Sequence, residues 1–124
     1  MSEELAADNK LEMKAVRDGL LQTPKVIVLI NKGSASASEI VAGALRDHKR
    51  AILVGETSYG KGTVQEAEDL GQGAGLHVTI AKWLTPNGTW VNGKGLTPDI
   101  TVVQDAKDPS KDTQLEKAIL QLIK

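Results

Sequence analysis

Two short segments of this chain hold residue types that could carry out nucleophilic chemistry. The first is Gly33–Glu39, in which three serines stand where a buried strand is expected to pass into a helix. The second is Gly60–Gln65, in which one lysine stands between two glycines. Serine is a weak nucleophile unless a base takes its proton, and a lysine can do so when desolvation lowers its pKa from about 10.4 toward neutrality. The two segments therefore indicate a serine nucleophile with a lysine base.

Ser36 also has a purely structural interpretation. Ser36 and Glu39 have the spacing of a capping box, in which the serine hydroxyl only satisfies a free N–H group of the helix. Its position favours chemistry, because a helix N-terminus after a buried strand offers an exposed hydroxyl beside N–H groups that can stabilise an oxyanion. The backbone N–H of Ala37 would be one such donor. The pattern alone leaves both interpretations open.

The loop around Lys61 has a competing interpretation as a nucleotide site. Residues 55–63 nearly spell a phosphate-binding P-loop, but that motif requires Ser or Thr directly after the lysine as a ligand for Mg²⁺. Here Gly62 follows Lys61, and the hydroxyl comes one residue late, at Thr63. Glu56 would also direct negative charge toward the phosphates. Nucleotide binding is therefore the weaker interpretation.

The two histidines invite comparison with a Ser-His-acid triad. His48 lies at the far end of the helix that Ser36 is expected to open, roughly 18 Å away at about 1.5 Å per residue, which excludes a hydrogen bond if the helix is continuous. His77 falls on an alternating strand. Two histidines without a carboxylate cluster predict no metal site, and we expect no cofactor.

Composition predicts a single globular domain and excludes several classes of function. The chain has 124 residues, of which 40% are hydrophobic and 25% charged, with a net charge of -1. Basic and acidic residues are interleaved, and the aromatic residues are two Trp and one Tyr, so nucleic acid is not expected as a partner. The lack of cysteine excludes disulfides and a thiolate nucleophile. Met1–Leu5 is acidic without an apolar run, so we expect no targeting signal or membrane segment in this chain.

The elements before Ser36 follow from the hydrophobic pattern. Residues 1–24 are expected to form a polar, helical segment, because Met13, Val16 and Leu20 have helical spacing. Lys25–Ile30 is a continuous apolar run, which is typical of an interior strand covered on both faces.

The elements after Ser36 complete an α/β pattern. A helix over residues 37–49 and a second buried strand, Ala51–Val54, would form a right-handed β-α-β unit with parallel strands. The Lys61 loop then leaves the carboxyl end of a strand, where α/β sheets place their sites.

The last part of the chain predicts antiparallel strands and a closing helix. A glycine turn at Gly71–Gly75 precedes the alternating strand Leu76–Leu84, and turn signals surround a short strand at Thr89–Val91. Trp83 and Trp90 are expected to cover a small core. A helix should open with a capping box at Thr113, with Leu115, Ala118, Ile119 and Leu122 facing inward.

With these residues in view, the chain resembles the C-terminal processing peptidases, also called tail-specific proteases, of the S41 group of serine peptidases. The segments that carry the resemblance are Val28–Ile40, Val54–Glu56, Gly60–Gln65, Leu84–Gly88, Gly95–Asp99 and Gln114–Ala118, in that order. Together they are highly specific. The resemblance implies that residues 25–124 are the C-terminal part of an S41 catalytic domain, with no PDZ domain in this chain.

The resemblance also implies roles for individual residues. By position, Ser36 would be the nucleophile, Lys61 the general base, Gln65 the residue that orients the lysine, and the Ala37 backbone an oxyanion donor. The implied fold is a partial core of the ClpP/crotonase type, on which substrate lies as an added strand. The implied activity is cleavage near the C-termini of proteins, in the periplasm, cell envelope or another extracytoplasmic place.

The chain departs from the family pattern by omission. Family members usually carry, upstream of this region, a PDZ domain that captures the substrate tail and a glycine-containing motif that gives a second oxyanion donor. Neither is in this sequence, so we expect association with an upstream half-core or PDZ domain, or self-association. The alternative is a non-catalytic binding or scaffold fragment of the same fold.

Overall fold

Two sheets and two helices make up the part of the chain that the computed structural model describes, which is residues 1–5, 9–14, 19, 22–108 and 110–124. The strands are β1 (Ser2–Leu5), β2 (Lys10–Glu12), β3 (Ile27–Ile30), β4 (Ile52–Gly55), β5 (Thr63–Gly71), β6 (Ala74–Leu84) and β7 (Ile100–Thr101), and the helices are α1 (Ala37–Asp47) and α2 (Thr113–Leu122). Within these described residues, neither helix is long and apolar enough to cross a membrane. The fold is mixed α/β, as predicted.

The smaller sheet is parallel and has the order β3-β4-β7. β3 and β4 pair in register from Ile27 with Ile52 to Ile30 with Gly55, and α1 connects them. The predicted β-α-β unit with parallel strands is therefore confirmed. In β4, Leu53 and Val54 are fully buried, as a central strand requires.

The prediction that β3 is an interior strand is wrong for the described sheet. β3 pairs with β4 on one side only, and Leu29 is 40% exposed, while Ile30 alone of this strand is buried. A β-branched apolar run predicts a strand well but cannot show whether a second neighbour covers it. The outer edge of β3 therefore presents unpaired backbone groups.

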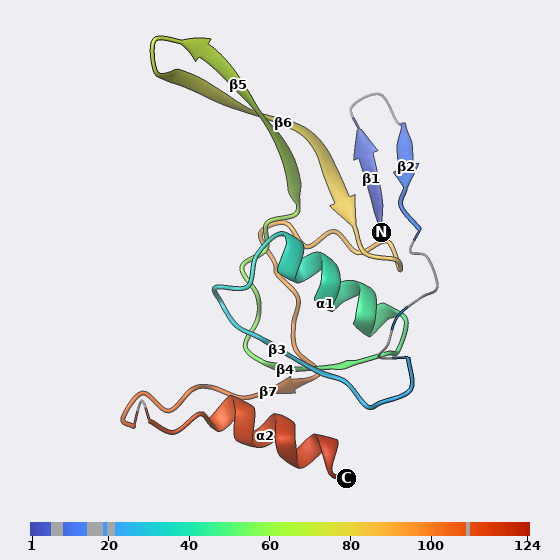
Figure 1. The fold of residues 1–124 in the computed structure, drawn as a ribbon, viewed down its shortest axis with the longest axis vertical. Coiled ribbons are helices and arrows are strands. Elements are labelled where there is room, and N and C mark those ends of the chain that lie inside the picture. The colour runs from blue at the N-terminus through green and yellow to red at the C-terminus, as the bar shows by residue number, and fades with distance from the viewer. Residues whose placement is uncertain (6–8, 15–18, 20–21, 109) are drawn as a thin grey trace.

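α1 lies between the two sheets and gives the core its centre (Figure 1). The buried core consists of Ile30, Ala42, Leu53, Trp83, Val91 and Leu96. These residues come from β3, α1, β4, β6 and the loop that follows β6. Because Ser36 is the N-cap of α1, the packing of Ala42 in the core also fixes the position of that serine relative to the sheet.

The larger sheet is antiparallel and has the order β2-β1-β6-β5. β5 and β6 form a long hairpin that extends away from the rest of the chain (Figure 1). Their two-residue loop, Gln72 and Gly73, has positive φ at both positions, 54° and 80°, which matches the right-handed twist of a hairpin. The predicted turn and the strand β6 are confirmed, but β5 was not predicted, because acidic residues hide its alternation.

The expectation of a helix over residues 1–24 is wrong for the residues described. β1 and β2 form an antiparallel pair, and β1 adds to β6 from Ser2 opposite Leu84 to Leu5 opposite Ala81. Val16 and Leu20, which suggested helical spacing, lie outside the described residues. Pairing with the edge of β6 overrides the local preference of this polar segment, because strand formation depends on the partner more than on the residues themselves.

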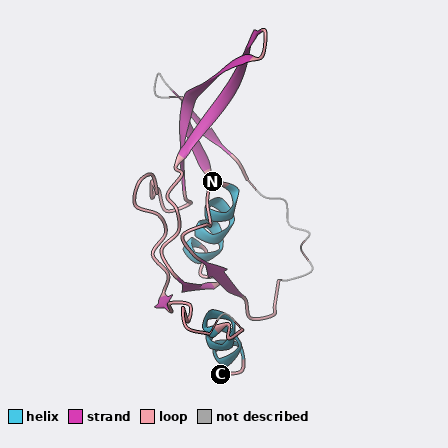
Figure 2. Cartoon of the chain, turned by 90° about the vertical axis from the view of Figure 1, so that its left-hand side faces the viewer, coloured by secondary structure: helices cyan, strands magenta, loops and turns pink. Residues whose placement is uncertain are grey.

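α2 confirms the predicted C-terminal helix, with two corrections. Its N-cap is Asp112, whose carboxylate accepts from the N–H of Leu115 at 2.9 Å, one residue before the predicted start of the capping box. α2 packs on β3 and β4 below the smaller sheet (Figure 2). Of the four residues expected to face inward, only Ala118 is buried, whereas Leu115, Ile119 and Leu122 are 46%, 48% and 41% exposed. The predicted short strand at Thr89–Val91 is a loop.

Two neighbouring positions of β4 test this description of the core. Leu53→Ala removes a fully buried side chain and should lower the free energy of unfolding by about 2–5 kcal/mol. Ile52→Ala, on the face where Ile52 is 39% exposed, should cost less than about 1.5 kcal/mol. Urea unfolding of the two variants measures both values, and equal losses would contradict the burial of β4.

Candidate active site

Ser36 stands at the turn between β3 and α1 with a strained backbone. Its φ is 54° and its ψ is -114°, a region that residues with a side chain rarely adopt. Such strain costs on the order of 1–3 kcal/mol and persists only where the surrounding structure imposes it, often at functional sites. A strained serine on a strand-to-helix turn is also the arrangement that exposes nucleophiles in other hydrolases.

Two polar groups at the start of α1 could meet a substrate carbonyl. The first is the Ser36 hydroxyl, which takes part in a capping box: the Ser36 side chain faces the N–H of Glu39, and the Glu39 side chain faces the N–H of Ser36. A hydroxyl in this position can still donate its own proton. The second is the N–H of the exposed Ala37, the first residue of α1, which has no acceptor among the described residues.

The carboxylate of Glu39 organises this turn from inside. Glu39 is completely buried, and its Oε2 accepts from the N–H of Ser36 at 3.0 Å. A buried carboxylate is tolerated only when it is hydrogen-bonded on all sides, because leaving it unpaired would cost several kcal/mol. The remaining partners of Glu39 all come from the loop between β4 and β5.

The same carboxylate holds the loop that carries Lys61. Oε1 of Glu39 accepts from Ser58 Oγ at 2.5 Å and from the N–H of Gly60 at 2.6 Å, and Oε2 accepts from the N–H of Lys61 at 2.9 Å. Since Oε2 binds the amides of both Ser36 and Lys61, the two amide nitrogens lie no more than about 6 Å apart. The structure thus brings the two predicted motifs together through one buried side chain. From the sequence, Glu39 was expected only to take part in the capping box.

Lys61 lies beside Gly62 in a tightly packed loop. Its side chain is half-buried, and its amine makes no hydrogen bond or ion pair with the described residues. A Cβ at Gly62 would lie 2.6 Å from the backbone nitrogen of Asn92 and 2.8 Å from Nε1 of Trp90. The glycine after the lysine is therefore required by packing.

The packing of this loop contradicts the P-loop interpretation. The N–H groups of Gly60 and Lys61 bind Glu39, and the N–H of Gly62 donates to Asn92 Oδ1 at 3.4 Å, so none of the three is directed at a phosphate. The loop also leads into β5, whereas a P-loop leads into a helix. The alternative prediction of nucleotide binding by this loop is therefore wrong.

Gln65 lies on β5 and makes no hydrogen bond with Lys61 among the described residues. Its side chain is exposed, and its amide donates to Thr79 Oγ1 across the hairpin at 3.5 Å. His48 is the C-cap of α1, at the opposite end from Ser36, which confirms that it cannot serve as the base. His77 is exposed on β6.

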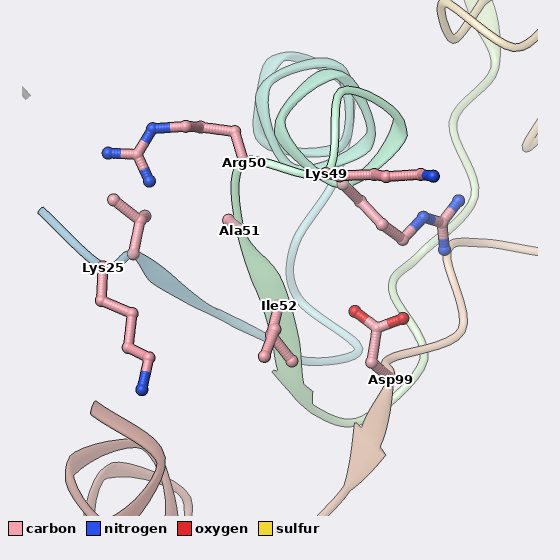
Figure 3. Close-up of a pocket in the computed structure, with 8 residues that line it drawn as sticks. Lys25, Lys49, Arg50, Ala51, Ile52 and Asp99 are labelled. Carbon is pink, nitrogen blue, oxygen red and sulfur yellow. The ribbon is translucent and has the colours of Figure 1, made fainter. Parts of the chain in front are cut away.

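A separate hollow at the amino end of the smaller sheet is rich in cations but does not form an anion site. It is lined by Lys25, Val26, Arg46, Lys49, Arg50, Ala51, Ile52 and Asp99. The cationic groups point in different directions (Figure 3), and three of them donate to backbone carbonyls: Lys25 to Gln121 at 3.3 Å, Arg46 to Thr97 at 3.2 Å and Arg50 to Pro24 at 2.5 Å. The described part of the chain likewise holds no group of three side chains suited to a metal ion.

Comparison with known proteins shows which family this arrangement belongs to. The sequence profile of Peptidase family S41 matches residues 3–102. The chain belongs to this family of peptidases. The match includes β1 and β2, which the resemblance from residue 25 onward did not cover.

Relatives of this chain are named as proteases. The chain is 55% identical over 86 residues to a carboxy-terminal-processing protease of Bartonella bacilliformis, covering 69% of this chain and 20% of that protein. It is 53% identical over 79 residues to the carboxy-terminal processing protease CtpB of Bacillus subtilis, covering 64% of this chain and 16% of that protein. The chain therefore spans a fifth or less of the length of these relatives.

Solved structures agree with the S41 assignment. The photosystem II D1 C-terminal processing protease is 40% identical and aligns with a TM-score of 0.61, over 81% of this chain and 25% of that one. A lipoprotein from Streptococcus agalactiae aligns with a TM-score of 0.75 over 98% of this chain and 43% of that one, but at 17% identity this likeness shows the fold alone.

The variant Glu39→Gln tests the buried carboxylate. Glutamine keeps the shape but supplies one acceptor oxygen in place of two and turns an NH₂ group toward backbone donors, so we expect a loss of about 3 kcal/mol in the free energy of unfolding. Chemical denaturation measures this loss. Glu68→Gln, on the exposed part of β5, is the matched control and should change stability by less than about 0.5 kcal/mol. A similar effect of the two changes would contradict the role of Glu39.

Proposed function

We propose that this chain supplies the nucleophile and the base of a serine endopeptidase that cleaves proteins near their C-termini. The observation that carries the proposal is the strained Ser36 at the start of α1, held beside the Lys61 backbone by the buried carboxylate of Glu39. The family of the chain and the processing-protease names of its relatives support the same activity.

The reaction follows from the groups that are free in this site. Oγ of Ser36 attacks the substrate carbonyl carbon while the neutral amine of Lys61 takes the hydroxyl proton. The carbonyl oxygen becomes an oxyanion, which accepts from the N–H of Ala37 at the positive end of α1. As the peptide C–N bond breaks, Lys61 returns the proton to the leaving amine. Water, deprotonated by Lys61, then attacks the ester carbon. As the C–O bond to Ser36 breaks, Lys61 returns that proton to Ser36 Oγ and the carboxylic acid product leaves.

Gln65 is proposed to orient the amine of Lys61. Residues two and four apart on an extended strand share one face, so Lys61, Thr63 and Gln65 lie on the same side if the loop enters β5 extended. The register shift beside Gln65 places the extra residue on β6, which leaves the alternation of β5 intact. In this proposal the Gln65 amide exchanges Thr79 for Lys61 when substrate binds.

The substrate is proposed to bind as an extended chain beside the smaller sheet. The outer edge of β3 is unpaired in the described sheet and ends at the Ser36 turn, which is the arrangement needed to add a strand and lead its carbonyl to the serine. A ClpP/crotonase-like core, contact with an upstream half-core or PDZ domain, and an extracytoplasmic location belong to the same proposal. Relatives named chloroplastic support a location outside the cytosol.

Two substitutions test the Ser36 and Lys61 assignment in the protein that contains these 124 residues. Ser36→Ala and Lys61→Ala should each lower kcat for cleavage of an unstructured protein tail by at least about 10³-fold, because each removes a group that bonds to the reacting atoms. Ser38→Ala is the matched control in the same turn and should retain activity, since Ser38 is exposed and has no side-chain partner among the described residues. Activity that survives either of the first two changes rejects the assignment.

A second candidate is a binding or scaffold module of the same fold. It is favoured by the share of the relatives that the chain covers, since the chain spans a fifth or less of the length of the two proteases described above. Among the described residues, Ala37 is the one oxyanion donor proposed for the site. A fluorophosphonate probe, which reacts with activated serines, separates the two candidates. We expect stoichiometric labelling at Ser36, found by mass spectrometry of the digested protein. If neither the wild type nor Ser36→Ala is labelled, the result favours the binding or scaffold module.

A further inference from the structure

The backbone of Gly60–Gly62 is hydrogen-bonded at every polar group. Its three N–H groups donate to Glu39 and Asn92, as described above. The carbonyl of Gly60 accepts from the N–H of Gly93 at 2.9 Å. The carbonyl of Lys61 accepts from one tryptophan side chain, and the carbonyl of Gly62 accepts from the other and from the N–H of Trp83 at 3.2 Å. A loop bound in this way holds the backbone of its lysine in one conformation, whereas loops are in general more mobile than the elements they connect.

The two indoles of the chain bind the consecutive carbonyls of Lys61 and Gly62. Nε1 of Trp83 donates to the carbonyl of Lys61 at 2.9 Å, and Nε1 of Trp90 donates to the carbonyl of Gly62 at 2.8 Å. Trp83 is buried in the core, and its packing there accounts for its position against the loop. Trp90 is 45% exposed, so burial of its ring does not by itself account for its place against this loop.

Trp90 is braced from the neighbouring sheet. Nζ of Lys82 lies 5.9 Å from the centre of the Trp90 ring, within the range of a cation–π contact. The same Nζ pairs with Glu4 Oε2 at 2.6 Å, and Glu4 lies opposite Lys82 in the β1–β6 pairing. The contacts therefore run from β1 through Lys82 and Trp90 to the carbonyl of Gly62.

We infer that Trp90 is a positioning residue for Lys61, acting through the hydrogen bond from its indole N–H to the Gly62 carbonyl. This inference rests on the proposed function of Lys61 as the base. Rotation of the peptide between Gly62 and Thr63 would change the backbone of Gly62, which joins Lys61 to β5, and carry the amine away from Ser36. The N–H of Trp83 holds the Gly62 carbonyl from β6, and the indole of Trp90, with Lys82 against its ring, adds a second bond that restricts this rotation.

The test separates the hydrogen bond from the shape of the ring. Trp90→Phe removes the donor and should lower kcat by at least about tenfold with KM nearly unchanged, and it should shift the pH dependence of kcat. Replacing Trp90 by 3-benzothienylalanine, which has the shape of tryptophan with sulfur in place of the N–H, should give the same loss. Replacing it by 7-azatryptophan, which keeps the N–H, should preserve kcat. A benzothienylalanine variant with wild-type kcat and pH profile would overturn the inference.

Two further variants make the failures distinguishable. Lys82→Gln keeps a polar side chain but removes the cation, and it should lower kcat by about twofold to fivefold. An unchanged kcat in the Lys82→Gln variant would overturn the bracing role of Lys82. If Lys61→Ala leaves cleavage intact, the proposed function fails. If Lys61→Ala abolishes cleavage while Trp90→Phe leaves kcat and its pH profile unchanged, only the role of Trp90 fails.

Discussion

The buried carboxylate of Glu39 is the interaction on which the rest of this site depends. It is fully buried on α1, three residues after Ser36, and it accepts from backbone groups on both sides of the site. Burial of a charge is costly, so the chain adopts a conformation in which four donors surround it. The strained turn at Ser36 and the tight loop at Lys61 are two parts of that one solution.

The core explains why those donors meet at one point. β3 and β4 are neighbours in a parallel sheet, so the turn after β3 and the loop after β4 leave the same edge. α1 starts at that edge and lies between the sheets, with Ala42 in the core. The loop then turns into the β5–β6 hairpin, and the tryptophans of β6 and the following loop close over it. Packing alone thus brings two motifs, separated by about 25 residues in the sequence, to one carboxylate.

Sequence predicted the elements whose pattern depends on local chemistry. The apolar runs gave β3 and β4, the helical period gave α1, and Ser36 with Glu39 gave the start of that helix. The helix expected over residues 1–24 failed because β1 forms by pairing with β6, a contact that no local pattern encodes. β5 was missed because Glu66, Glu68 and Asp69 hide its alternation, although the turn at Gly71–Gly75 marked where it ends. The expected burial of β3 and of one face of α2 failed because periodicity shows that a face is apolar, without showing what covers it. The positive φ of Ser36 and the partners of Glu39 depend on the tertiary structure, so the sequence could not show how the site is held.

We propose that Glu39 holds Ser36 and Lys61 in reach of one another. The decisive measurement is a crystal structure of the protein that contains this chain, at a resolution that fixes side-chain positions. It should show a positive φ at Ser36, both oxygens of Glu39 bonded to the amides of Ser36, Gly60 and Lys61, and Nζ of Lys61 within about 3.2 Å of Ser36 Oγ. An ordinary backbone at Ser36 with Glu39 turned to solvent, or a lysine amine beyond about 5 Å from the hydroxyl, would contradict it.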